Sequence, residues 1–355
     1  MKKNLSKAVS LFVVLFMMTL LPAGCGPSQS GGVATTSAVA AGAGSGTAEY
    51  NFIVSHSGTE NSINQYLAQR ASDLMAEKSG GRVKMTIYPN SQLGKTRESI
   101  EGMIAGNIDF VPYVSAGYVE FVKACALFDM PNVAPTLEIM RKALDGKITE
   151  LMKPEFEKSG LKFFGFSDGG FRQLTSNRAV RSMADFKGLK VRVMENKNHI
   201  KYWTSLGANP TPMDYSEVFI GLQQGTIDGQ ENPLDCPVDM KFYEVQDYLV
   251  YTNHMIFSLI MPMNLNKFNS LPPDIQKIVE ESVTQANQDT RDWADGKLKE
   301  YEKILTDGGL EVIELPDEVL AQMKDAAQST YDSVREQVGD ELVNTLLSEV
   351  DNASK

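Results

Sequence analysis

Two kinds of apolar spacing alternate along the chain from residue 50 onward. Residues 50–55 (YNFIVS), 83–88 and 108–113 are short runs rich in apolar side chains, which predicts three strands. The segment 62–78 has apolar residues at helical spacing, and a second helix is expected before the third strand. Strands that alternate with helices predict a parallel sheet covered on both faces, with ligands bound beyond the carboxyl ends of the strands.

A second region with the same α/β pattern covers residues 169–232. Its predicted strands are 172–175, 189–193 and 226–231, and its predicted helices are 196–207 and 214–224. Three side chains that can contact a ligand lie at the strand ends of this region: Arg192, Tyr215 and Asn232. The pattern therefore predicts a second α/β unit with its own ligand-binding edge.

One predicted helix is much longer than the others. From Asp274 to about Thr306 the chain has helical spacing and no proline, and Pro272 and Pro273 suit the first turn of a helix. At about 1.5 Å per residue this helix is about 50 Å long, which exceeds one small domain. We therefore expect a rod that connects two lobes.

The N-terminus has the layout of a secretory signal. Lys2, Lys3 and Lys7 precede an apolar run over residues 8–21, which is too short for a comfortable membrane span of roughly 20 apolar residues. The sequence therefore predicts a signal peptide over residues 1–25 and an exported protein, in the periplasm or at the cell surface.

The signal ends in the segment LPAGC, which resembles a bacterial lipobox with Cys25 as the lipidated residue. Pro22 departs from that pattern, so an ordinary signal cleaved after Ala23 or Gly24 is the alternative. Residues 26–49 are mostly Gly, Ser, Ala, Thr and Val, and they predict a flexible tether. Together these segments predict a lipoprotein held at a membrane.

Composition excludes several classes of function. The 355-residue chain has a formal net charge of −11, which argues against nucleic acid as a partner and against direct adhesion to anionic lipid. His56, His199 and His254 lie far apart without HExxH spacing, and no GxxxxGK[ST] or Gly-x-Ser-x-Gly segment is present. The sequence therefore predicts no catalytic residues, no metal site and no cofactor. Cys125 and Cys236 are expected as buried free thiols rather than a disulfide.

Two arginines carry the candidate chemistry. Arg172 and Arg192 each lie on a predicted strand or strand end. A guanidinium is a planar fork of donors that matches a carboxylate with two hydrogen bonds. An arginine in such a place is more often a solvated or salt-bridged surface residue. A pair of arginines within one unit, however, predicts a binding site for an organic acid.

Five ordered segments carry a family resemblance: SGGRVKMTIYPNSQLG, FRQLTSN, DFKGLKVRV, GANPTPMDYSEVF and LQQGTIDGQENP. They resemble the DctP-type solute-binding proteins of TRAP (tripartite ATP-independent periplasmic) transporters. The resemblance implies two α/β lobes joined by crossing strands and a long helix, as in periplasmic binding proteins, with a ligand cleft that closes by hinge motion. We expect lobe I to comprise residues 50–169 and 258–297, and lobe II residues 170–257 and 298–355.

The resemblance also implies roles for single residues. Arg192, in the KGLKVRV segment, makes the main carboxylate contact, and Arg172 of FRQLTSN assists it. Asn232 of GQENP and Tyr215, just before SEV, face the ligand. The turn His56–Asn61 supplies contacts from the other lobe.

The sequence favours one class of organic acid over another. Glu60 and Glu195 would repel a second carboxylate but accept hydrogen bonds from hydroxyl groups. A dicarboxylate would need a second cationic anchor, for which His56, Lys95 and Arg97 are the candidates. We therefore expect a sugar acid, such as a uronic or aldonic acid, ahead of a C4-dicarboxylate.

The predicted function is an extracytoplasmic receptor that captures an organic acid and delivers it to TRAP membrane permease subunits. A ligand that contacts both lobes only in the closed form shifts the balance between open and closed forms. One alternative is a sensor subunit that presents the ligand to a membrane kinase. A remote alternative is a secreted hydrolase of acidic sugars.

Overall fold

The chain divides into two units, residues 1–44 and 45–355, and the computed structural model describes residues 48–355. The predicted signal peptide, Cys25 and nearly all of the predicted tether lie outside the described residues. Within residues 48–355 no helix is long and apolar enough to cross a bilayer. The same residues contain no group of three or more His, Cys, Asp or Glu side chains placed to hold a metal ion.

Lobe I begins with the predicted strand–helix–strand unit. Strand β1 (Tyr50–Ser55) pairs in parallel with β2 (Val83–Tyr88), and helix α1 (Ile63–Lys78) connects them. The Ser62 side chain caps α1 because it accepts a hydrogen bond from a backbone N–H three residues later. Helix α2 (Thr96–Ile104) follows β2, so these four elements lie where the apolar spacing predicts them.

The predicted strand over 108–113 is the part of lobe I that differs from expectation. Phe110 makes only single bridges to its neighbours, and the short strand β3 (Tyr113–Val114) joins another sheet. The Asp109 carboxylate accepts the backbone N–H of Ile53 at 2.7 Å. Because a side chain occupies this position, a continuous ladder of backbone hydrogen bonds does not form along β1.

The remaining elements of lobe I surround one apolar core. The three-stranded sheet has the order β3–β11–β5, and β12 pairs with β4. These elements are β4 (Leu161–Lys162), β5 (Ser167–Phe171), β11 (Ile256–Ile260), β12 (Met263–Asn264), α3 (Leu137–Ala143), α4 (Thr149–Lys158) and α8 (Leu265–Asn269). Phe52, Phe110 and Phe163 are fully buried among them.

Lobe II is built on one six-stranded sheet in the order β13–β10–β6–β9–β7–β8. Strand β7 pairs in parallel with β8 and β9, whereas β6 runs antiparallel to β9 and β10. The strands are β6 (Gln173–Ser176), β7 (Lys190–Val193), β8 (Asn209–Pro212), β9 (Gly229–Asn232), β10 (Tyr248–Tyr251) and β13 (Glu311–Glu314). The helices are α5 (Lys197–Ser205), α6 (Val218–Gln223), α7 (Asp235–Asp239) and α10 (Asp317–Ala326).

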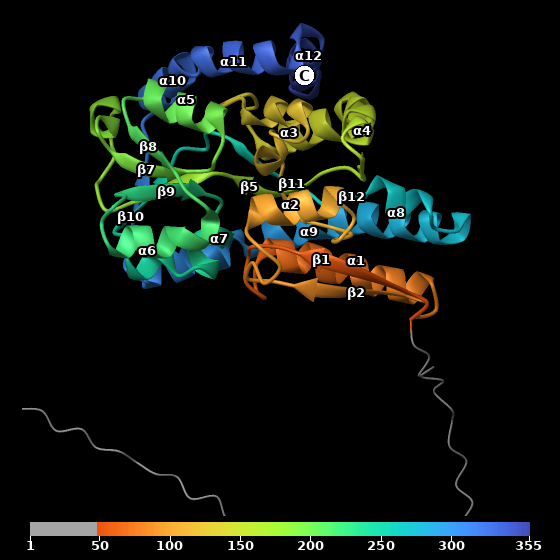
Figure 1. The fold of residues 1–355 in the computed structure, drawn as a ribbon. Coiled ribbons are helices and arrows are strands. Elements are labelled where there is room, and N and C mark those ends of the chain that lie inside the picture. Colours follow the sequence, from red (N-terminus) through yellow and green to blue (C-terminus); the bar gives the residue numbers. More distant parts are fainter. Residues whose placement is uncertain (1–47) are drawn as a thin grey trace, which may run out of the picture. The chain divides into compact units, whose positions relative to one another are not determined.

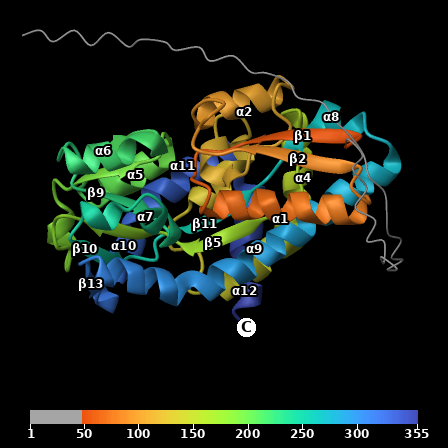
Figure 2. The same ribbon diagram turned by 90° about the horizontal axis from the view of Figure 1, so that it is seen from below.

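Two chain crossings and one long helix join the lobes. Strands β5 and β11 pair antiparallel in lobe I, and the chain continues directly from β5 into β6 and from β10 into β11 (Figure 1). Helix α9 (Pro273–Asp307) extends from beside β13 in lobe II to α8 in lobe I (Figure 2). Its side chains Val279 and Val283 belong to the core of lobe I, and Leu305 packs with lobe II residues. The helix is therefore the rod that its spacing predicts.

The C-terminal helices do not all lie in lobe II as the sequence analysis expects. Helix α11 (Gln328–Val338) packs on both α5 and the segment Lys123–Asp129, and α12 (Asp340–Ala353) packs on α3 in lobe I. Three side chains on one face of α12 enter the core of lobe I: Val343, Leu346 and Val350. The expectation that all of 298–355 lies in lobe II was wrong, because an apolar helix face does not specify which of two cores it covers.

Candidate ligand-binding site

A small space, which we call the inner cavity, lies between the two lobes. Lobe I lines it with Ser57, Asn64 and Tyr113, among others, and lobe II lines it with Arg192, Tyr215 and Asn232. Arg192 comes from β7, Asn232 from the end of β9 and Tyr215 from the short helical turn Tyr215–Glu217. Since both lobes form its walls, a molecule in this cavity would contact both.

A second space, the outer compartment, adjoins the inner cavity. Four residues line both spaces: Tyr113, Arg192, Met194 and Tyr215. Arg97 and Glu195, both exposed, line the outer compartment only. Arg192 therefore lies at the junction between the buried and the more exposed part of the cleft.

Arg192 is buried, but its guanidinium keeps N–H donors that a ligand can bind. Its side chain is 2% exposed, and its Nε and Nη2 atoms donate to the backbone carbonyl of Met213 at 2.9 and 2.6 Å. Within residues 48–355 no carboxylate forms an ion pair with it, and burial lowers the pKa of Arg192 from its ordinary value. An arginine remains protonated at neutral pH even so. A buried cation without a carboxylate partner favours an anion in the adjoining space.

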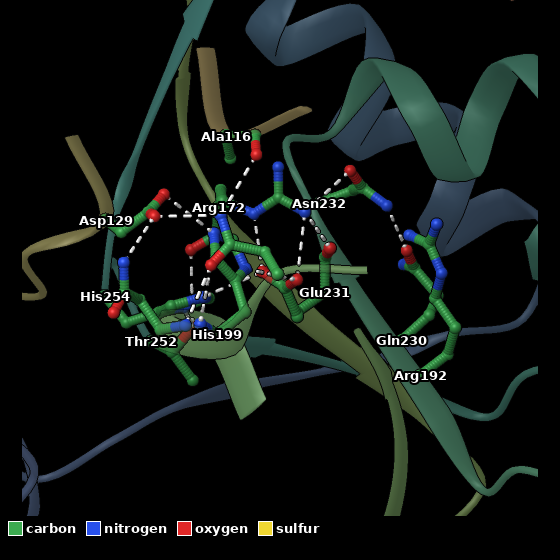
Figure 3. Close-up of polar contacts among 12 residues, drawn as sticks. Ala116, Asp129, Arg172, Arg192, His199, Gln230, Glu231, Asn232, Thr252 and His254 are labelled. Carbon is green, nitrogen blue, oxygen red and sulfur yellow. Dashed lines mark hydrogen bonds and ion pairs between the residues drawn. The ribbon is translucent and has the colours of Figure 1, made fainter. Parts of the chain in front are cut away.

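Arg172 differs from the expected ligand contact. Its Nε donates to Glu231 Oε2 at 2.5 Å, and its Nη2 donates to Glu231 Oε1 at 3.0 Å and to Asn232 Oδ1 at 2.9 Å. It lines neither the inner cavity nor the outer compartment, and its charge is paired inside the protein. Figure 3 shows its guanidinium beside Glu231, with Arg192 apart from both. Arg172 thus orients Asn232, which does line the inner cavity.

Glu231 is the centre of a buried polar network that the sequence did not reveal. Besides Arg172, it contacts His254 Nε2 at 3.0 Å and His199 Nδ1 at 3.4 Å. Burial alone would raise the pKa of Glu231, but Arg172 and the two histidines hold it well below its ordinary value. The only local signal for this role is an acidic residue within a predicted strand.

The network continues across the lobe boundary through Asp129 (Figure 3). Asn196 and Asn198, at the start of α5, donate to Asp129 Oδ2 at 2.8 and 3.0 Å. His199 Nε2 lies 3.4 Å from Asp129 Oδ1, an ion-pair contact rather than an aligned hydrogen bond. Burial lowers the pKa of His199, but the contacts with Asp129 and Glu231 raise it overall. Lobe I and lobe II are therefore joined by buried charge as well as by backbone.

The other predicted site residues are divided between several places. Tyr215 and Asn232 line the inner cavity, and Glu195 lines the outer compartment. Glu60 is exposed and lines a groove between α1, α7 and α9 but not the inner cavity. His56 is buried and lines none of these three spaces. The sequence analysis missed Asn64, whose helix position gives no signal of a ligand contact.

His56, expected as a ligand contact, is buried inside lobe I and does not line the inner cavity. It is 2% exposed, and its Nε2 lies 3.0 Å from Gln65 Oε1. Burial lowers the pKa of His56 from 6.5 to about 4. The neighbouring turn residues Ser57 and Gly58 line the inner cavity instead.

The pKa of His56 predicts a pH dependence of stability. A histidine that is neutral when folded stabilises the fold above its unfolded pKa of 6.5, and this contribution is lost as the pH falls toward 4. The shift corresponds to about 3 kcal/mol. We expect the difference in free energy of unfolding between wild type and His56→Gln to change by about this amount between pH 7 and pH 4. Urea unfolding at several pH values measures it, and a difference that stays constant with pH would contradict the assignment.

The architecture and the cavity define a class of protein, a two-lobed receptor for a small ligand bound between its lobes. The model of the family "bacterial extracellular solute-binding protein, family 7" (DctP) matches residues 54–337. The chain belongs to this family, and it is a DctP-type TRAP solute-binding protein.

Similar proteins agree with this assignment. The 2,3-diketo-L-gulonate-binding periplasmic protein YiaO of Escherichia coli (strain K12) is 33% identical over 247 residues, which cover 69% of this chain and 75% of that protein. A TRAP periplasmic solute-binding protein from Roseobacter denitrificans OCh 114 with bound L-galactonate has a TM-score of 0.78 and is 30% identical to this chain. The match covers 86% of this chain and 99% of that protein. A TRAP periplasmic solute-binding protein from Sulfurospirillum deleyianum DSM 6946 with bound succinate has a TM-score of 0.79 and 27% identity, and covers 84% and 99%.

Proposed function

We propose that this protein captures an organic acid in the inner cavity and delivers it to TRAP membrane permease subunits without changing it chemically. The observation that carries the proposal is Arg192, a buried cation without an ion-pair partner among the described residues, at a cavity lined by both lobes. A ligand carboxylate supplies the missing counter-charge. An unpaired charge in such a place is costly, so the ligand anion and the guanidinium stabilise each other.

Contacts across the mouth of the cleft support a closing mechanism. Lys95 of lobe I donates to Glu217 of lobe II at 2.7 Å, and the backbone N–H of Thr59 donates to Asp239 at 3.3 Å. Such contacts exist only when the lobes are shut. A ligand that also contacts both lobes adds its binding energy to the closed form alone, and binding therefore shifts the protein toward that form.

The ligand class follows from the charges that line the cleft. Arg192 is the one cationic side chain that lines the inner cavity, and Asp235 adds a carboxyl group to its lining. We favour a sugar acid over a C4-dicarboxylate for this reason. The relatives support both classes, since one has bound L-galactonate and another bound succinate.

The test is a ligand screen on residues 48–355. Thermal-shift measurements with sugar acids, C4-dicarboxylates and neutral sugars should raise the melting temperature only with acids, because ligand binding to the folded state alone stabilises it. Mass spectrometry of the recovered ligand should show the molecule unchanged. Stabilisation by neutral sugars but by no acid, or turnover of the ligand, would contradict the proposal.

Membrane attachment through a lipid on Cys25 is a further part of the proposal. It depends on the sequence LPAGC, since Cys25 lies outside the described residues. We expect Cys25→Ser to move the protein from the membrane fraction of the producing cell to the soluble fraction, because the lipid is the anchor. Immunoblots of the two fractions measure this. A variant that remains with the membranes would show that Cys25 is not the attachment point.

A further inference from the structure

Three buried polar side chains that line the inner cavity have an atom without a hydrogen-bond partner within residues 48–355. The atoms are Ser57 Oγ, Asn64 Oδ1 and Asp235 Oδ1. The three residues are 8%, 7% and 7% exposed. Buried polar atoms are almost always paired, because an unpaired one destabilises the fold. All three side chains line one cavity, so a molecule bound there would supply the missing partners.

One of these side chains, Asp235, lies toward a different side of the cavity from Arg192. Arg192 is shared with the outer compartment, whereas Asp235 and Ser62 are shared with the groove between α1, α7 and α9. The inner cavity therefore has a cationic side toward the outer compartment and an uncharged or acidic side toward the groove. Asp239 lines the groove but not the inner cavity.

The cationic side and the acidic side of the inner cavity suit different chemical groups of one ligand. A carboxylate suits Arg192. A hydroxyl group suits Asp235 in either protonation state, because a hydroxyl both donates and accepts, whereas a carboxylate can only accept. Burial and the neighbouring Asp239 raise the pKa of Asp235 to about 7, so both of its states occur near neutral pH. A second ligand carboxylate would meet an ionised Asp235 and be repelled.

We propose that Asp235, together with Ser57 and Asn64, forms a hydroxyl-binding end of the inner cavity that selects polyhydroxylated monocarboxylates and rejects dicarboxylates. This inference rests on the proposed function, in which Arg192 holds the ligand carboxylate. It makes Asp235 a specificity-determining residue. The competing explanation is that Asp235 only helps to begin helix α7, where it is the first residue.

The experiment compares ligands that differ at one end only. Galactonate and galactarate, and gluconate and glucarate, are pairs in which a terminal CH₂OH group is replaced by a carboxylate. Isothermal titration should show that wild type binds the hydroxyl-ended member of at least one pair about a hundredfold more tightly or better. In Asp235→Asn the affinity for that member should fall about ten- to a hundredfold, since a hydrogen bond to a charged group is lost, and the preference over the diacid should shrink at least tenfold.

Glu300→Gln is the control. It removes an exposed carboxylate that lines the groove but not the inner cavity. It should leave the affinity for each ligand and the ranking within each pair unchanged. An equal loss of affinity for both members in Asp235→Asn, or no preference for the hydroxyl-ended member in either wild-type pair, would overturn the inference. Binding of acids that does not depend on Arg192 would instead overturn the proposed function.

Discussion

Replacement of Arg192 by alanine should abolish high-affinity binding of any acidic ligand. The substitution removes the one cationic side chain of the inner cavity and leaves the ligand carboxylate buried without a counter-charge. Loss of one partner of a buried charge pair costs about 3–5 kcal/mol, so the Kd should rise by several hundredfold or more. Isothermal titration with the best ligand from the screen measures the change.

Two further variants make the Arg192 result specific. Arg192→Lys keeps the charge but loses the two-pronged donor fork, so its affinity should fall between wild type and alanine. Arg97→Ala removes a cation that lines only the outer compartment and is paired with Glu101 at 3.0 Å, so it should change the Kd by less than about threefold. Circular dichroism should show that all three variants fold. An unchanged Kd in Arg192→Ala would remove the basis for the binding site.

Replacement of Glu231 by glutamine should cause the largest loss of stability. The side chain keeps its shape, but the Arg172 guanidinium, 1% exposed, then lacks a carboxylate partner, and His199 and His254 lose an acceptor. An uncompensated buried charge costs about 3–5 kcal/mol. Urea unfolding at pH 7 should show this decrease in the free energy of unfolding.

The control for this prediction is Glu311→Gln. Glu311 also pairs with an arginine, Arg181, but both side chains are exposed, and such pairs contribute about 0–1 kcal/mol. The stabilisation by Glu231 is fully present above the unfolded pKa of glutamate. It should decline progressively as the pH falls below that value, and it is lost completely only below the much lower folded pKa. Equal stability of the two variants would show that the buried network does not hold the lobes.

Elements with a strong local pattern were predictable from the sequence. The first strand, the helix after it and the strand at 83–88 lie at the predicted positions because a single run of side chains determines each. The helix Pro273–Asp307 matches the predicted range within one residue at each end. The strand at 108–113 was wrong because the Asp109 side chain replaces a backbone partner, and single-residue spacing does not reveal such an exchange.

The same limit separates the two arginines. Arg192 lies on β7 and Arg172 lies between β5 and β6. Both can bind a carboxylate, so the sequence cannot distinguish them. The fold brings Glu231 within 2.5 Å of Arg172 across neighbouring strands, and it leaves Arg192 beside a backbone carbonyl and an empty space. Which of the two arginines is neutralised therefore depends on which one pairs with a carboxylate from a distant part of the chain.

By itself, the sequence determined the α/β lobes, the connecting rod, the acidic character and the guanidinium pair, because each depends on side chains close together in the chain. Only the tertiary structure decided that Arg172 is neutralised, that Asp235 enters the cavity and that residues 340–353 return to lobe I. Which side chains are buried, and which of them pair, depends on segments that are distant in the chain and meet only in the folded protein. The spacing of residues along the chain does not reveal these contacts.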